Sequence, residues 1–276
     1  MPEILQYSFF QNAVLSSILA GILCGFIGTY IVTRRLVFIA GGLAHASLGG
    51  VGICALLSLD PTIGATSFSL LSAYGIKKAG QSNSQKQDSV IAMLWAFGMS
   101  IGIICVYLSP SFLPDLPNYI FGNILLSTSS DILFLGTLTI ITAIFFIRHM
   151  RHITAIAFDR DFALSMRLPV NLYESILLAL TALAIVAILR AMGIVLAISL
   201  LSIPHITASI FAKDFSHIIK YSIGITITEC MAGLIVSYQL NVPSGASIVF
   251  VSVLIYMLCR TIKNFSQRFN QKTHHV

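Results

Sequence analysis

The chain has 276 residues, of which 57% are hydrophobic and only 9% are charged, and its mean hydropathy is +0.91. Soluble domains carry about 25% charged residues, so this composition excludes an ordinary water-soluble globular protein. Sixteen lysines and arginines against ten acids give a formal charge of +6. No segment is basic enough to form a nucleic-acid-binding face, so no nucleic-acid partner is expected. The composition is typical of a protein that crosses a membrane several times.

Apolar segments of roughly the length needed to cross a bilayer follow one another along the chain. Helices are predicted for all of them, because a segment in lipid must satisfy its backbone hydrogen bonds internally. The pattern predicts an all-α, polytopic membrane helical bundle of about nine transmembrane helices (range 8–10), because several segments are short or share tight turns. The expected spans are residues 13–33, 36–58, 61–76, 89–109, 131–147, 173–190, 191–212, 218–238 and 245–262.

The basic residues predict how the chain is oriented in the membrane. With nine spans, fifteen of the sixteen lysines and arginines fall on one side, and only Arg190 falls on the other. By the positive-inside rule, the N-terminus is expected outside and the C-terminus in the cytoplasm. The predicted location is the bacterial cytoplasmic (inner) membrane, as a multi-pass protein in contact with membrane lipid.

Glycines mark places where helices could approach closely. Gly21 and Gly25 form one GxxxG pair, and Gly98 and Gly102 form another, each a weak signal for close helix contact. Residues 41–50 read GGLAHASLGG, an unusual density of small residues for one span. Two interpretations of this segment remain open: a tightly packed helix, or an interrupted helix that lines a pathway.

Three ionisable residues fall inside predicted spans, where such groups are costly and usually functional: His45, His205 and Glu229. Each lies eight to ten residues from a basic residue at the cytoplasmic edge, or about 12–15 Å into a core about 30 Å thick. Two imidazoles and a carboxylate at one depth are plausible ligands for a divalent metal, with zinc favoured. Alternatively, each group separately stabilises a helix contact, since equal depth does not show that the three face one another.

Enzyme motifs are missing from the sequence. It contains no HExxH, no GxSxG and no GxxxxGK[ST] phosphate-binding loop, so neither catalysis nor ATP binding of that type is expected. The chain is predicted to be a conduit without a prosthetic group. A transported divalent metal would be its cargo.

The longest predicted cytoplasmic region is residues 148–172, which mix charges with an apolar series that includes Phe158, Phe162 and Leu164. This pattern predicts a short amphipathic helix at the membrane face that ends before Pro169. Such a helix could rest on lipid or dock into the groove of a soluble partner, and composition alone favours neither.

Several ordered blocks resemble the permease (transmembrane) subunit family of ATP-binding-cassette importers for zinc, manganese or iron. They include TRRLVFIAGGLAHASLGGVG (33–52), AFDRDFALSMRLPV (157–170), LRAMGIVLAISLLSIPHITA (189–208) and SYQLNVPSGASIVF (237–250). The resemblance covers nearly the whole chain as one permease domain, 1–276. It implies a homodimer with a second permease copy, two cytoplasmic ABC ATPase subunits that hydrolyse ATP, and an extracytoplasmic metal-binding protein that delivers the ion.

The resemblance also assigns roles to residues and shows two departures. It implies ATPase coupling by Phe158, Asp159, Arg160, Phe162 and Ala163. The family commonly has Asp-x-x-x-His in the second span, whereas this chain has Gly41 before His45, and it has His205 where the family usually has Ala. We therefore expect a rearranged site in which His205, and Glu229 with it, compensates for the lost aspartate, and this nitrogen-rich shell favours zinc over manganese.

Two other classes of function remain alternatives. One is a secondary active cation transporter that uses the intramembrane histidines and Glu229 as a relay. The other is a membrane scaffold that transports nothing.

Overall fold

The computed structural model describes residues 7–80, 84–109 and 122–273. Within these ranges every regular element is a helix, as the sequence predicts. In chain order the elements are α1 (Ser8–Thr33), α2 (Val37–Leu56), α3 (Pro61–Gly80), α4 (Ser84–Leu108), the short 3-10 helix η2 (Ile124–Leu126), α6 (Ser129–Phe158), α7 (Arg160–Ser165), α8 (Val170–Met192), α9 (Ile194–Leu200), α10 (Ile203–Phe211), α11 (Phe215–Leu240) and α12 (Ser244–Thr273).

Eight candidate membrane spans in this part of the chain are long and apolar enough to cross a bilayer, with α9 and α10 together forming one of them. The segment expected at 61–76 is the helix α3, which is long enough but has too many polar residues to qualify by apolarity. The prediction of a polytopic helical bundle with eight to ten spans is therefore confirmed. The difference between eight and nine depends on how α3 is counted.

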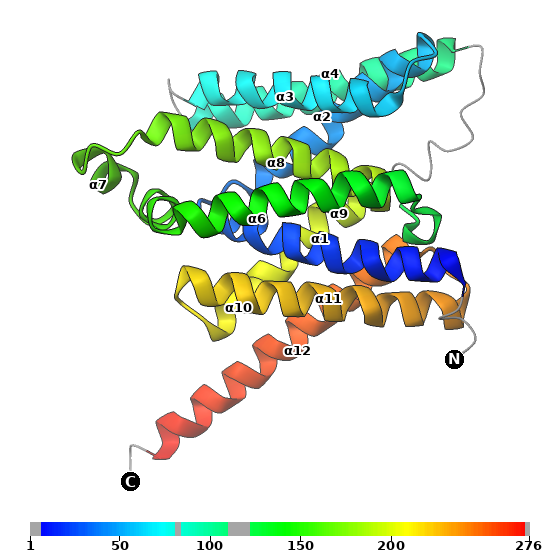
Figure 1. Cartoon of the computed structure of the whole chain (residues 1–276). Coiled ribbons are helices and arrows are strands. Elements are labelled where there is room, and N and C mark those ends of the chain that lie inside the picture. The colour runs from blue at the N-terminus through cyan, green and yellow to red at the C-terminus, as the bar shows by residue number, and fades with distance from the viewer. Residues whose placement is uncertain (1–6, 81–83, 110–121, 274–276) are drawn as a thin grey trace.

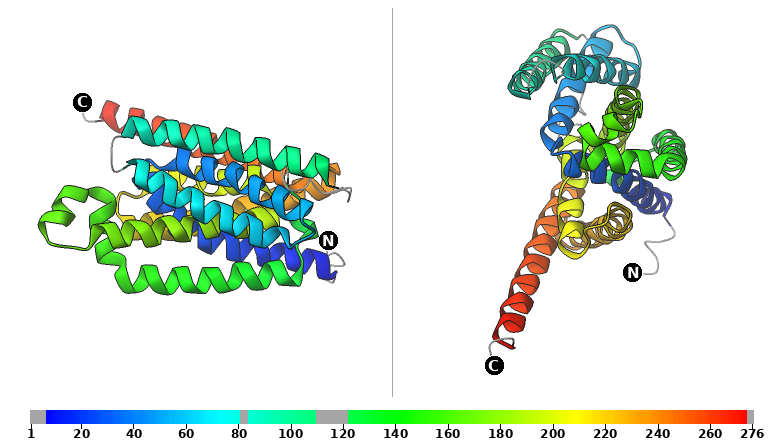
Figure 2. Two further views of the ribbon diagram at one scale, coloured as in Figure 1. Left: turned by 90° about the horizontal axis from the view of Figure 1, so that it is seen from above. Right: turned by 90° about the vertical axis from the view of Figure 1, so that its left-hand side faces the viewer.

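The long helices lie side by side in the bundle (Figure 1). α1 packs against α11 and α6, whereas α2 packs most closely against α4 and α3. The helix α7 lies at one end of the bundle, and α1 begins at the opposite end (Figure 1). The C-terminal half of α12 leans away from the other helices, which Figure 2 shows in its right-hand view. The main hydrophobic core lies where α1, α8 and α9 meet the helices around them.

The small-residue segment 41–50 lies in one continuous helix, α2, so its interpretation as an interrupted helix is wrong. Its glycines instead allow close packing. A β-carbon at Gly50 would lie 2.0 Å from the carbonyl oxygen of Gly64 in α3, and one at Gly52 would lie 2.5 Å from that of Gly102 in α4. The backbones of α2, α3 and α4 therefore touch, as expected for small residues in membrane helices.

An interrupted span does occur later in the chain. The seventh predicted span, 191–212, is divided into α9 and α10 by Leu201 and Ser202. Pro204 lies in the first turn of α10, where its missing N–H costs nothing because the first helical N–H groups have no partner within the helix. Before α9, Gly193 has a φ of 87°, which favours glycine and ends α8.

The amphipathic region predicted at 148–172 differs from the structure in one respect. The helix of the fifth span does not end near Arg148 but continues to Phe158, with a kink at His149, whose φ is −117°. Only the six-residue α7 forms a separate helix, and it ends before Pro169 as predicted. The reason is local: no proline or glycine occurs between 148 and 158, so nothing ends the helix until Asp159 caps the next one.

Candidate metal pathway and coupling region

His45 lies on α2 and faces α4. Its imidazole stacks on the indole of Trp95, with ring centroids 4.2 Å apart and planes 12° apart. The side chain is partly exposed, and its Nδ1 atom is buried with no hydrogen-bond partner among the described residues. The same indole lies over Gly41, where an added β-carbon would be 3.3 Å from Cζ3. Trp95 therefore occupies space that an aspartate at position 41 would need.

His205 lies on α10 and is fully buried against α1. Its Nε2 atom is 2.8 Å from the carbonyl oxygen of Cys24, and because a carbonyl can only accept, Nε2 carries the proton. Only Nδ1 keeps a free lone pair, and it has no partner in the described part of the chain. The geometry is that of a residue that holds α10 against α1.

Glu229 lies on α11 and is also fully buried. Its Oε2 atom accepts a hydrogen bond of 2.7 Å from the hydroxyl of Ser252 in α12. Its Oε1 atom is buried and has no partner within the described ranges. This bond joins α11 to α12, the helix that leans out of the bundle.

The structure does not bring the three predicted metal ligands together. Each faces a different helix, and no group of three His, Cys, Asp or Glu side chains close enough to hold a metal ion occurs in the residues described. A shared site for His45, His205 and Glu229 stays a prediction that needs α10 and α11 to move relative to α2. Of the three, His45 alone has an exposed part.

The five predicted coupling residues differ in what they contact. Phe158 and Phe162 are 60% and 55% exposed, which is unusual for phenylalanines at the end of a bundle. Asp159 caps α7 by accepting a hydrogen bond of 2.9 Å from the backbone N–H of Phe162. Ala163 is fully buried in a small apolar cluster between α6 and α8. The two phenylalanines therefore point outward, whereas Ala163 fixes α7 to the bundle.

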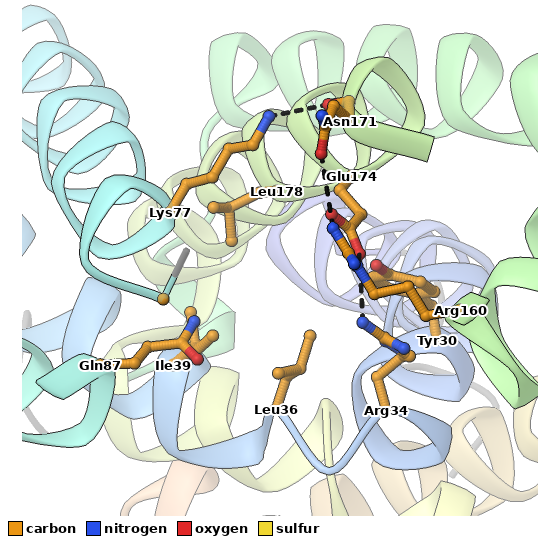
Figure 3. A pocket seen from close by; sticks show the side chains of 11 residues that line it. Tyr30, Arg34, Leu36, Ile39, Lys77, Gln87, Arg160, Asn171, Glu174 and Leu178 are labelled. Carbon is orange, nitrogen blue, oxygen red and sulfur yellow. Dashed lines mark hydrogen bonds and ion pairs between the residues drawn. The ribbon is translucent and has the colours of Figure 1, made fainter. Parts of the chain in front are cut away.

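Arg160 points into a cavity of about 580 Å³ at the α7 end of the bundle (Figure 3). Its Nε atom lies 3.0 Å from Oε1 of Glu174 on α8, and the same oxygen lies 3.1 Å from Nη2 of Arg34, at the end of α1. Lys77 of α3 also lines the cavity and donates to the carbonyl oxygen of Asn171. Sequence reasoning missed Glu174. The available signal was an acid at the edge of a span, close to several basic residues.

Arg190, the one cation predicted on the opposite side, lies in a separate network. It pairs with Asp131 at the start of α6, and its Nη1 atom donates to the hydroxyl of Thr62 in α3 at 2.6 Å. Its Nη2 atom donates to the hydroxyl of Ser130 at 3.1 Å. The network joins the ends of α3, α6 and α8, and Arg190, Asp131 and Ser130 line a smaller cavity of about 340 Å³.

Comparison with known proteins gives three consistent findings. The sequence profile of the "ABC 3 transport family" matches residues 6–263. The chain is 35% identical to a Chlamydia muridarum protein named "Probable metal transport system membrane protein", over 93% of this chain and 91% of that protein. It is 30% identical to the "Manganese transport system membrane protein MntC" of Listeria monocytogenes, over 94% and 92%.

A solved structure is also similar, that of "PsaBC from Streptococcus pneumoniae in complex with Fab". The TM-score is 0.83 with 29% sequence identity, and the match covers 92% of this chain and 91% of the solved one. The arrangement of helices described above is therefore shared over nearly the full length of both chains.

Proposed function

The chain belongs to the ABC 3 transport family, and on this basis we propose that it is the permease subunit of an ATP-driven importer of divalent metal ions. The observation that carries the proposal is the full-length match to proteins named for metal transport, combined with a bundle of membrane-spanning helices. The chain itself carries no enzymatic site in this proposal. ATP is hydrolysed by a separate subunit, and a metal-binding protein delivers the ion from outside.

The ATPase contacts the exposed side of α7 in this proposal. Phe158 and Phe162 present apolar surface at the end of the bundle, where a helix can dock into the groove of a soluble partner. The interpretation as lipid-bound helix is less favoured, because a helix of six residues offers little apolar area to a membrane. Asp159, Arg160 and Ala163 act in the same region by shaping and fixing α7.

We propose that His45 is the primary ligand along the metal pathway. It is partly exposed, and its Nδ1 atom lacks a partner in the described chain. One imidazole is too few, since zinc sites use about four ligands. A second copy of the chain, related by a two-fold axis, would supply a second His45. His205 and Glu229 stay candidate ligands for a state in which their helices have moved.

The identity of the metal is the finer part of this proposal. The nitrogen-rich shell predicted from sequence favours zinc. The argument for zinc is weaker because Nε2 of His205 is already bonded to a backbone carbonyl and is not free to bind a metal. In addition, relatives such as the Listeria protein are named for manganese. We therefore propose a first-row divalent cation, with manganese and zinc as the two candidates to be compared directly.

The experiment that tests the function reconstitutes the permease with its ATPase in vesicles. Metal-loaded binding protein, added outside, is expected to stimulate ATP hydrolysis and metal uptake together. A matched sample with an ATPase inactivated in its phosphate-binding loop is expected to take up no metal. Uptake that needs only a proton or cation gradient would establish the secondary transporter instead. Absence of uptake with all subunits present would support the scaffold.

A further inference from the structure

We infer that Glu174 is a positioning residue that transmits movement of α7 to the junction between α1 and α2. The inference rests on the proposed function, because it assigns α7 to the ATPase side and α2 to the metal pathway. It concerns the cluster formed by Arg34, Arg160 and Glu174, which we call the arginine–glutamate clamp. None of these three residues belongs to the predicted metal site.

In the clamp, one carboxylate oxygen of Glu174 connects α8 to α7 and to the end of α1. Oε1 of Glu174 on α8 accepts from Arg160, the first residue of α7, at 3.0 Å, and from Arg34 at 3.1 Å. Arg34 also donates through Nη1 to the backbone carbonyl of Ile156 near the end of α6, at 3.3 Å. Figure 3 shows the guanidinium groups of both arginines, from two different elements, pointing at the carboxylate. A displacement of α7 therefore reaches Arg34 through Glu174.

The clamp is partly withdrawn from water, which distinguishes it from a surface ion pair. The side chains of Glu174, Arg34 and Arg160 are 18%, 22% and 39% exposed. Partly buried charges interact more strongly than exposed ones, and removal of one partner leaves the others uncompensated. Without the carboxylate, two guanidinium groups would face each other with no anion between them.

The connection continues from Arg34 to the helix that carries His45. Arg34 is the residue that ends α1, and Arg35 follows with a φ of 59°, a strained conformation for an arginine. α2 then begins at Val37 after a single further residue. Because this turn is so short, rotation of Arg34 cannot be absorbed by a flexible loop and is passed to the start of α2.

The main packing contacts of α7 are with α6 and α8. α7 packs through Ala163 on Ile156 of α6 and Val170 of α8, and neither contact involves α1 or α2. The cavity beside the clamp leaves room for the arginine side chains to change partner when α7 moves. The clamp is thus positioned to be made in one state of the transport cycle and broken in another.

The test uses the complete complex with its ATPase and binding protein in vesicles, and it compares metal transported per ATP hydrolysed. For Glu174→Gln we expect the ATPase to remain bound and the basal ATP hydrolysis to stay near wild type, while the thermal unfolding temperature falls because two guanidinium groups lose their carboxylate. We expect the metal transported per ATP to fall by about 5-fold or more, the size of a typical coupling energy. Glu174→Asp, which keeps the charge, should restore part of the ratio.

Two further variants separate coupling from a general charge effect. Asp214→Asn removes an exposed acid that pairs only loosely, at 3.3 Å, with His217, and it should leave the ratio unchanged. Arg34→Gln should lower the ratio as Glu174→Gln does, and the double variant should be no worse than either alone, because both remove the same link.

A wild-type ratio for Glu174→Gln would overturn the inference, and so would loss of the ATPase from the complex, since that result makes Glu174 merely structural. Failure of the proposed function is seen separately. In that case the wild-type complex moves no metal before any variant is measured.

Discussion

The imidazole of His205 occupies the space over Gly28 that a side chain would fill. A β-carbon on Gly28 would lie 2.2 Å from Cε1 of His205. The contact places the ring of α10 directly on the backbone of α1, next to its hydrogen bond with Cys24. His205 and the glycine are therefore fitted to each other, and this fit explains how a histidine is accommodated inside the bundle.

Gly28→Ala is expected to lower stability. The added methyl group must displace a fully buried ring, and such overpacking costs about 1–3 kcal/mol. Gly224→Ala on α11 is the matched control, because a β-carbon there meets nothing within 4 Å. Thermal unfolding of the purified protein in detergent checks both. Equal unfolding temperatures for the two variants would contradict the fit described above.

His45→Ala is expected to abolish metal uptake, because it removes the side chain of a partly exposed residue on the proposed metal pathway. Glu229→Gln is expected to keep its bond with Ser252, since an amide oxygen also accepts hydrogen bonds. Uptake of metal by the reconstituted complex, at equal protein levels, is the measurement. If His205→Ala and Glu229→Gln transport like wild type while His45→Ala fails, the shared three-ligand site is excluded.

Competition between metals for uptake identifies which divalent cation the protein transports. With radioactive manganese as the tracer, unlabelled zinc should inhibit uptake more than equal unlabelled manganese if nitrogen ligands dominate the site. The opposite order is expected if oxygen ligands from elsewhere complete the shell. Trp95→Ala removes the indole that stacks on His45 and covers Gly41. The same competition measurement on this variant tests whether the space beside Gly41 and His45 affects the choice of metal.

Asp60 gives a prediction for pH dependence outside the membrane spans. Hydrogen bonds from the side chain and backbone of Thr62 hold the pKa of Asp60 below its usual value. The carboxylate thus stabilises the start of α3 above its ordinary pKa, and this contribution is lost as pH falls through the lowered folded-state pKa. Asp60→Ala should cost about 0.5–2 kcal/mol near pH 7. The difference from wild type in thermal unfolding should shrink at pH 3, whereas a constant difference would refute a charge-dependent cap.

Sequence reasoning predicted the spans well because apolar length is a local property. The sequence also predicts one depth for His45, His205 and Glu229 from the rise per residue, and this stays a prediction. It could not tell which way each side chain points, because rotation about a helix axis is set by the neighbours that pack against it. His205 illustrates this limit: its partner is the backbone of Cys24, 181 residues away in the chain.

The coupling region shows a second limit. Arg148 and Arg151 interrupt the apolar run, but a helix need not end where an apolar run does, and α6 continues to Phe158. Glu174 was overlooked because an acid at the edge of a span, close to several basic residues, does not by itself show which of them it pairs with. Its role becomes visible only when the fold places it between Arg34 and Arg160.

The modest apolarity of α3 has a consequence for how the chain is synthesised. A membrane helix of modest apolarity is stabilised by neighbours that cover its polar face. Gly64 of α3 packs on Gly50 of α2, and α2 is translated immediately before α3. The buried hydroxyl of Ser69 in α3, by contrast, donates to the carbonyl oxygen of Ala182 in α8, which is translated more than a hundred residues later. We therefore expect α3 to enter the bilayer as a hairpin with α2 and to reach its final position only after α8 has been translated.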